Sequence, residues 1–334
     1  MAHHYVSARG AAQLPKYKYS GNDRSLLYNY FLSPLAQRIV DTFFPPWLAP
    51  NTITTGGLAL VATSHVILAY YAPTLDGIAP PAAYFFSAAA LFWYQVLDVT
   101  DGKQARKTGN SSPLGLLFDH GCDAVNVVFS ACTMTSTMLM GPSIWSLGLL
   151  LAPSCVFLFA TWEEYYTGSL DLGLVNGPNE GLAIMYVIYA ITGVLGPAIW
   201  TQPCVLYPAL PNNAVFVIAT ALGAAGQCLV NVFNVSQAVT PAKFVAALGR
   251  LSPFVGFIAA SLAYGLYSPS DVLHSHPRLL LWTIGLISCK VHEEAVLYGV
   301  SAGVVAVYVH MVYFVVTDLT AILKIKVFTV KEKQ

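Results

Sequence analysis

Residues 97–123 read LDVTDGKQARKTGNSSPLGLLFDHGCD, and this stretch decides how the rest of the chain is interpreted. It holds four of the chain's 16 acidic residues. The first two are three positions apart and the last two are four apart, so each pair shares one face of a helix. The turn-forming residues 109–113 break the helical pattern between the pairs, so we expect two helices that fold side by side and bring all four carboxylates together. These carboxylates are Asp98, Asp101, Asp119 and Asp123.

The four aspartates predict a metal site. Neighbouring carboxylates repel one another and are costly to desolvate unless a cation lies among them. Oxygen ligands select a hard divalent ion rather than zinc, and two carboxylate pairs suggest two ions, Mg²⁺ or Mn²⁺. Two ions suit an in-line displacement at phosphorus. Arg106 offers a planar fork for a phosphate, and small residues leave room for a ligand: Gly102, Ala105 and Gly115.

The composition places this acidic stretch in a membrane protein. Of the 334 residues, 56% are hydrophobic and only 10% are charged, whereas about 25% are charged in soluble domains. These values exclude a soluble enzyme, a disordered chain and a basic nucleic-acid binder, so we expect no nucleic acid among the partners. The six cysteines show neither a disulfide framework nor the spacing of a zinc site.

We predict an all-α, polytopic integral membrane protein with about 8–10 transmembrane helices. Residues 25–47 mix apolar and charged positions and predict an interfacial amphipathic helix that ends at Pro45 and Pro46. The chain therefore divides into a cytosolic N-terminus with that helix (1–47), a transmembrane catalytic domain (48–323) and a basic tail (324–334). Apolar runs that meet or nearly meet the length of a span occupy 53–72, 82–97, 124–140, 145–161, 181–200, 213–231, 252–267 and 295–317, and a shorter run occupies 279–289.

The placement of lysine and arginine orients these spans. Basic residues precede the first span and follow the second and the sixth. The loops on the opposite side of the membrane contain a single basic residue, Arg278. By the positive-inside rule, the N-terminus and residues 98–123 are cytosolic. The lysines of the tail lie in the cytosol only if the number of spans is even. Counting the short run 279–289 as a span makes that number odd. The sequence around 279–295 therefore looks one helix short.

The acidic stretch also resembles a known signature. It reads D-x2-D-G-x2-A-R-x8-G-x3-D-x3-D, which is similar to the signature of the CDP-alcohol phosphotransferases. The resemblance implies that the four aspartates bind two divalent ions and that Arg106 contacts the CDP diphosphate. Such an enzyme transfers a phospho-alcohol from a cytidine diphosphate to an acceptor hydroxyl and releases CMP.

Further stretches resemble the eukaryotic choline and ethanolamine phosphotransferases, most closely the plant and algal type. Residues 48–51 (LAPN) match an element in which the asparagine approaches the CDP moiety, so this resemblance gives that role to Asn51. An N-cap role for Asn51 at the first span is compatible with it. The implied substrates are CDP-choline or CDP-ethanolamine and diacylglycerol, taken from the lipid bilayer. The resemblance further implies a homodimer and an endoplasmic reticulum or Golgi membrane, with the active site facing the cytosol.

Two residues compete for the role of catalytic base. His120 lies between two of the aspartates, and an imidazole suits a general base; the resemblance to the eukaryotic branch assigns it that role, whereas other branches assign it to Asp123. Many members of the resembled family carry a glutamate four residues before the histidine, where this chain has Leu116. The helix therefore cannot supply that carboxylate partner, so we expect either that another residue orients the imidazole or that the base is less well tuned.

Other groups and functions stay open. The aromatic and acidic residues at 162–166 suit a quaternary ammonium group but equally an interfacial aromatic belt. Glu180 suits either a functional role or a helix start. A CDP-diacylglycerol-dependent phosphatidyl-alcohol synthase and a cation transporter are the alternative functions. The members of the resembled family generally have a further segment between Lys290 and His292, so we expect a missing outer helix and poor packing around 279–317.

Overall fold

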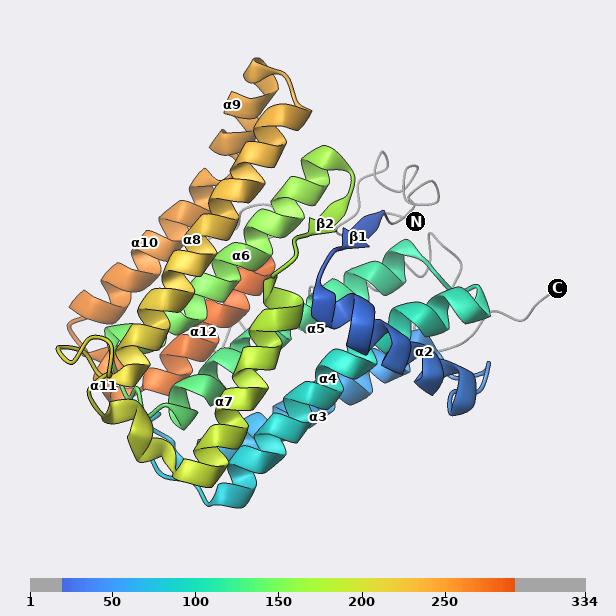
Figure 1. The fold of residues 1–334 in the computed structure, drawn as a ribbon. Helices are drawn as coiled ribbons and strands as arrows, with labels where there is room; N and C mark the ends of the chain where they lie inside the picture. The colour runs from blue at the N-terminus through green and yellow to red at the C-terminus, as the bar shows by residue number, and fades with distance from the viewer. Residues whose placement is uncertain (1–19, 292–334) are drawn as a thin grey trace, which may run out of the picture.

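The structure is a computed structural model that describes residues 20–291. It is almost entirely helical, and Figure 1 shows the helices as one bundle, with α2, α3 and α4 on one side and α8, α9 and α10 on the other. The bounds are β1 Gly21–Asp23, η2 Tyr28–Leu32, α2 Ser33–Thr42, α3 Pro50–Tyr71, α4 Pro81–Thr108, α5 Pro113–Thr137, α6 Ile144–Thr167, β2 Leu170–Leu172, η3 Gly177–Gly181, α7 Leu182–Leu195, η4 Pro197–Thr201, α8 Asn212–Ala238, α9 Pro241–Gly249, α10 Ser252–Tyr267, α11 Val272–Ser275 and α12 Pro277–Val291.

Six helical runs in the described part are long and apolar enough to cross a membrane. The sequence places proline in the first turn of many of these helices, where its missing N–H costs no hydrogen bond. A further helix, α5, is 25 residues long but carries more polar residues, and α12 is a shorter apolar helix. The six runs are α3, α4, α6, η3 with α7 (Gly177–Leu195), α8, and α9 with α10 (Pro241–Tyr267).

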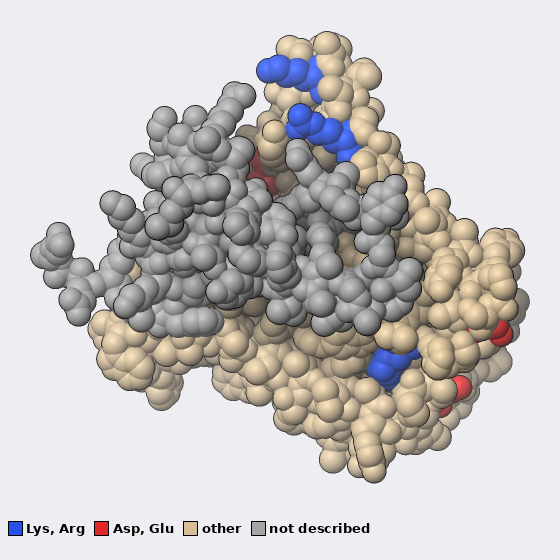
Figure 2. Space-filling model, turned by 180° about the vertical axis from the view of Figure 1, so that it is seen from behind, with Lys and Arg blue, Asp and Glu red and all other residues tan. Residues whose placement is uncertain are grey.

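The face shown in Figure 2 carries few charged side chains among the described residues, as the composition predicts for a surface against lipid. The part of the chain predicted to form an interfacial helix is helical as η2 and α2, which end at Thr42, shortly before the two prolines. Lys107 of α4 donates to the carbonyl of Val40 (2.6 Å), so the C-terminus of α2 is held against α4.

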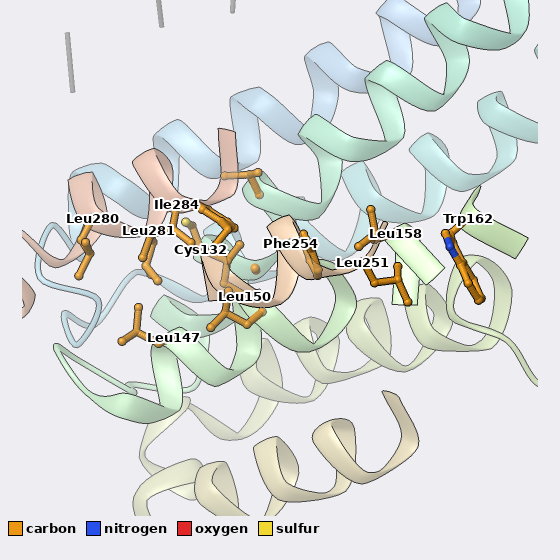
Figure 3. Packing of buried hydrophobic residues seen from close by; sticks show 14 of the residues in the cluster. Cys132, Leu147, Leu150, Leu158, Trp162, Leu251, Phe254, Leu280, Leu281 and Ile284 are labelled. Atoms are coloured by element: carbon orange, nitrogen blue, oxygen red, sulfur yellow. The ribbon is translucent and has the colours of Figure 1, made fainter. Parts of the chain in front are cut away.

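The core consists of two larger clusters and a small one. One joins α3, α4, α5 and α7 around Tyr94, Met134 and Tyr189. The other joins α5, α6, α10 and α12, and Figure 3 shows how Leu147 and Leu150 lie near Leu281 and Ile284. Both clusters include residues of α5, so the helix with the second aspartate pair has core on two sides.

The packing expected to be poor around 279–317 is in fact close over its described part. Leu280, Leu281, Ile284 and Leu286 of α12 are all buried. That expectation was wrong for 279–289, because apolar side chains of α5, α6 and α10 cover this short helix. The span at 295–317 and the tail at 324–334 lie outside the described residues.

Candidate metal and substrate site

The break between α4 and α5 forms as the sequence predicts. Gly109 ends α4 with a left-handed backbone (φ 70°), which glycine adopts without steric cost. The N–H of Asn110 then closes the helix end on the carbonyl of Ala105 (2.9 Å). Ser112 caps α5 by accepting from the N–H of Gly115 (3.1 Å), and Pro113 follows in the first turn.

Three of the four aspartates come together. Asp98 of α4 and Asp119 and Asp123 of α5 each offer a carboxylate oxygen, and these oxygens lie within 4.8 Å of one another. The Oδ1 atoms of Asp98 and Asp119 are buried and accept no hydrogen bond from the described residues. Buried carboxylate oxygens without a donor are costly. The donor set is all oxygen, so these residues fit a hard divalent ion.

Asp101 lies outside this group of three. It is buried, at 6% exposure, and its Oδ2 accepts a hydrogen bond from Thr54 of α3. Asp101 therefore contacts α3 through Thr54, whereas Asp98, Asp119 and Asp123 are the three whose oxygens lie within 4.8 Å of one another.

Tyr94 supports the acid group and was not predicted from the sequence. Its ring is buried at 2% exposure, and its hydroxyl donates to Oδ1 of Asp123 (2.6 Å). The available signal was its spacing, since Tyr94 lies four residues before Asp98 and hence on the same face of α4. Spacing was also the available signal for Thr54, the donor to Asp101, since it lies three residues after Asn51 on the same face of α3.

The residues predicted to bind the CDP moiety lie around the same turn. Asn51 is buried in the first turn of α3, and a Cβ added at Gly115 would lie 3.9 Å from its Oδ1. Arg106 is exposed, and its Nη1 lies 3.6 Å from the position of a Cβ at Gly102. Gly102 and Gly115 thus leave space beside Arg106 and Asn51 respectively. Ala105, half-buried on α4, accepts the helix-ending bond described above.

Gln104 fixes the backbone that leads into Asn51. It is fully buried, and its Nε2 donates to the carbonyls of Pro45 (2.9 Å) and Leu48 (3.0 Å). This amide therefore joins α4, one turn beyond Asp101, to the connection between α2 and α3. The position of Asn51 depends on that connection.

His120 has a partner that the sequence did not predict. Its Nδ1 lies 3.1 Å from the backbone carbonyl of Leu116, and its ring makes an edge contact with Phe157 (6.4 Å between centroids). The side chain of residue 116 is no partner, but its backbone carbonyl is available whatever that side chain is. With Nδ1 as the donor, the lone pair of Nε2 is left to accept a proton.

The aromatic and acidic group at 162–166 does not converge on one site. Trp162 is buried and donates to the carbonyl of Ala247 (3.2 Å), whereas Tyr165 is exposed beneath Arg250 (5.5 Å to the ring centroid). Glu163 is buried and accepts from two amides of α8, those of Asn231 (2.5 Å) and Asn234 (2.9 Å).

Glu180 connects two distant segments. Its Oε1 accepts from the hydroxyl of Ser25 (2.5 Å) and its Oε2 from the N–H of Asn176 (2.9 Å). The turn that contains it is held against α4, because Gln95 donates to the carbonyl of Asn179 (2.9 Å). Gln95 lies three residues before Asp98, so this turn lies close to the acid group.

Comparison with known proteins agrees with this geometry. Residues 47–224, which include both aspartate pairs and Asn51, match the family described as CDP-alcohol phosphatidyltransferase. The chain belongs to this family. As a member of the CDP-alcohol phosphatidyltransferase family with six apolar helical runs, it is a multi-pass membrane protein. The family is typically metal-dependent, and Asp98, Asp119 and Asp123 are the residues here that could hold a metal ion.

Individual relatives share much of the chain. It is 38% identical over 296 residues to "Choline/ethanolaminephosphotransferase 1" of Arabidopsis thaliana, covering 84% of this chain and 75% of that protein. It is 36% identical over 304 residues to "Cholinephosphotransferase 1" of Danio rerio, covering 87% and 77%. "Choline/ethanolaminephosphotransferase 1" of Saccharomyces cerevisiae is 39% identical over 201 residues, covering 59% and 50%.

Proposed function

We propose that this protein transfers phosphocholine, phosphoethanolamine or both from the CDP-alcohol to diacylglycerol, producing phosphatidylcholine or phosphatidylethanolamine and CMP. The observation that carries the proposal is the group formed by Asp98, Asp119 and Asp123, in which two buried carboxylate oxygens lack a donor. The family match covers this group, and the named relatives are choline and ethanolamine phosphotransferases.

Asp98, Asp119 and Asp123 would hold divalent metal, with Asp101 as the fourth ligand at a second ion. Mg²⁺ or Mn²⁺ bound there would withdraw charge from the diphosphate and orient it for displacement. Asp101 already accepts a hydrogen bond from Thr54, which leaves its other oxygen for a ligand role. Arg106 and Asn51 would bind the CDP moiety beside Gly102 and Gly115.

His120 is the better candidate for the base. The Leu116 carbonyl would place the proton of a neutral imidazole on Nδ1, which leaves Nε2 to accept the proton of the acceptor hydroxyl. Asp123 already accepts a hydrogen bond from Tyr94 and belongs to the acid group, so its oxygens have other partners. In the proposed reaction the hydroxyl oxygen bonds to the β-phosphorus and the bond from that phosphorus to the bridging oxygen breaks. CMP leaves, and the proton goes to His120.

The charge distribution supports a proposed orientation. The basic residues that precede α3 and those in the last turns of α4 favour a cytosolic position for the acid group. The water-soluble CDP-alcohol would then enter from the cytosol, and diacylglycerol from the bilayer. Residence in the endoplasmic reticulum or Golgi membrane and a homodimeric assembly stay predictions that rest on the family.

A competition assay tests the proposed function. Radiolabelled CDP-choline and CDP-ethanolamine are supplied together to the purified protein in nanodiscs with diacylglycerol and Mg²⁺, and labelled lipid and CMP are measured. We expect labelled phosphatidylcholine, phosphatidylethanolamine or both, and none with Asp119→Asn. The alternative synthase would instead release CMP from CDP-diacylglycerol with a free alcohol. Absence of both reactions in folded protein that CDP-choline does not stabilise would contradict the proposal.

A further inference from the structure

The connection between α7 and α8 carries an exposed apolar tip. Val205 and Leu206 are each 92% exposed, and Tyr207, which follows them, is 58% exposed. Apolar side chains scattered singly over a surface need no explanation, but adjacent ones that are this exposed mark a contact with a partner or a membrane. Figure 1 shows the connection at the periphery of the bundle.

Hydrogen bonds at the base of the connection hold this tip in place. The N–H of Cys204 donates to the carbonyl of Leu210 (2.8 Å), which closes a loop around the tip. Behind it, the side-chain amide of Asn212, the first residue of α8, donates to the carbonyl of Ile199 in η4 (2.8 Å). The tip therefore projects from a closed base that is tied to α8, so its exposure is a feature of the fold.

The tip lies at the end of the bundle away from the acid group. In the last turns of α7, Gly193 meets the first turns of α4, since a Cβ added there would lie 2.9 Å from Cζ of Phe85. Phe85 precedes Asp98 on the same helix by a distance of about 20 Å, at a rise of about 1.5 Å per residue. The connection that follows α7 therefore belongs to the opposite side of the membrane domain.

The chain around the tip is free of charge. Residues 181–242, which include α7, the connection and α8, contain no Asp, Glu, Lys, Arg or His. Other connections at this end are different, since Asp76 before α4 and Asp271 before α12 are exposed. Arg278, in the first turn of α12, donates to the carbonyl of Ala72 (2.6 Å), which places these two connections at the same end. The lack of charge between α7 and α8 therefore favours contact with lipid over contact with water.

The size of the tip favours lipid over a protein partner. A stable protein interface involves about 20–30 residues on each side, whereas this tip offers three large apolar side chains. The last turn of α7, which leads into the connection, also exposes Val194 (71%) and Leu195 (63%) on a helical run that is apolar enough to cross a membrane. Tyrosine, as at Tyr207, is enriched where the hydrocarbon of a membrane meets its polar surface.

We propose that residues 205–207 insert into the bilayer leaflet opposite the acid group and anchor the connection between α7 and α8 there. The side chains of Val205 and Leu206 enter the upper acyl region, and the phenol of Tyr207 lies among the head groups. Segments of this kind insert by about 5–10 Å. Deeper insertion would leave irregular backbone in hydrocarbon without hydrogen-bond partners. This inference does not depend on the proposed function.

Fluorine NMR in nanodiscs of dioleoylphosphatidylcholine tests the depth of the tip. 4-Trifluoromethylphenylalanine replaces Leu206 in one variant and, as the matched control, Ser270 in another, since Ser270 is exposed in the connection between α10 and α12. Relaxation by a nitroxide on the lipid acyl chain is compared with relaxation by a water-soluble gadolinium chelate. We expect the nitroxide to act at least about threefold more strongly than the chelate at 206, and the reverse at 270. A stronger effect of the chelate at both positions would overturn the proposal.

A substitution at the tip makes the same test sharper. With the fluorine label at position 207, Leu206→Asp should reduce the effect of the nitroxide to the level measured at 270, because a carboxylate is costly in the acyl region. The tip makes no core contact, so this variant should fold like wild type, which its thermal midpoint verifies. A nitroxide effect that stays as strong as without Leu206→Asp would overturn the proposal.

Photocrosslinking distinguishes lipid from a second copy of the chain. p-Benzoylphenylalanine in place of Leu206 is photolysed in the same nanodiscs, and the products are separated by mass. Products heavier than the chain by one lipid molecule support the proposal. Products of twice the mass of the chain would overturn it and assign the tip to a contact between copies.

Discussion

The phenol of Tyr94 and the carboxylate of Asp123 are joined by a hydrogen bond of 2.6 Å between α4 and α5. It is a partly buried polar link between the helices that carry the two halves of the aspartate motif. Tyr94 orients Asp123 from outside the acid group, as an outer hydrogen-bond partner does for many metal ligands.

Tyr94→Phe should lower activity without unfolding the protein. The ring stays in the core, but Asp123 loses the donor that orients it. We expect the concentration of Mg²⁺ for half-maximal activity to rise by about 10–100-fold, the usual effect of removing an outer partner of a metal ligand. Tyr189→Phe is the control, because that buried hydroxyl contacts the carbonyl of Ser130 instead (3.4 Å). Equal effects of the two variants would show that the Tyr94 hydroxyl has no special role.

Chelation should abolish turnover. Without a cation the carboxylates of Asp98, Asp119 and Asp123 repel one another, so EDTA should stop CMP release and Mg²⁺ or Mn²⁺ should restore it. Asp98→Ala, Asp101→Ala, Asp119→Ala and Asp123→Ala should each remove activity while the protein stays inserted and folded. Asp76→Ala, at an exposed position between α3 and α4, should retain it. Full activity in the presence of EDTA would contradict the metal site.

A substitution of Thr54, which donates to Asp101, distinguishes a metal-ligand role for Asp101 from a role as an acceptor for α3. Thr54→Val removes the hydroxyl that donates to Asp101 but leaves the carboxylate in place. We expect an intermediate loss of activity that additional Mg²⁺ partly restores, in contrast to Asp101→Ala, which Mg²⁺ should not restore. Titration of activity with Mg²⁺ measures the difference. If Asp101→Ala and Thr54→Val behave alike, Asp101 acts only as an acceptor for α3.

His120→Ala should reduce turnover far more than donor affinity. Loss of a general base typically costs about 10²–10⁴-fold in rate, whereas the residues proposed to bind CDP remain. Steady-state kinetics should therefore show a much lower kcat with a nearly unchanged KM for the CDP-alcohol. His276→Ala, in the exposed connection before α12, serves as the control. Near-normal turnover of His120→Ala, with an inactive Asp123→Asn that still binds metal, would assign the base to Asp123.

Asn231→Ala should destabilise the contact between α6 and α8. The buried Glu163 carboxylate would keep only the amide of Asn234, and an unsatisfied buried acceptor costs about 1–3 kcal/mol. Thermal unfolding in detergent should show a lower midpoint, whereas KM for the CDP-alcohol should stay the same. Gln237→Ala, on the exposed side of α8, is the matched control. A midpoint equal to that of wild type would show that the carboxylate finds another partner.

Local features of the site could be predicted from the sequence, because they depend on short spacings. The turn around Gly109, the cap at Ser112 and the pairing of Asp119 with Asp123 all follow from residues a few positions apart. The contact of Asp101 with Thr54 joins α4 to α3, and no short spacing in the sequence indicates this contact between helices.

Partners that come from distant helices could not be predicted in the same way. Nothing near Glu163 indicates the two asparagines about 70 positions later that bind it in α8, so its burial was unexpected. The partner of His120 is a backbone carbonyl, which has no signature in the sequence. The close contact of α12 with α5 depends on how near Gly285 lies to Val128, and packing distances of this kind require the folded chain.

The parallel pairing of β1 with β2 has a consequence for the order of assembly during synthesis. Asp23 lies beside Leu172 and accepts from the amide of Asn179 (2.6 Å), while Ser25 donates to Glu180. Residues 21–25 therefore lack these partners until about 150 further residues, including α6, have been synthesised. The turn that Gln95 holds against α4 is therefore joined to the N-terminal segment only late in synthesis.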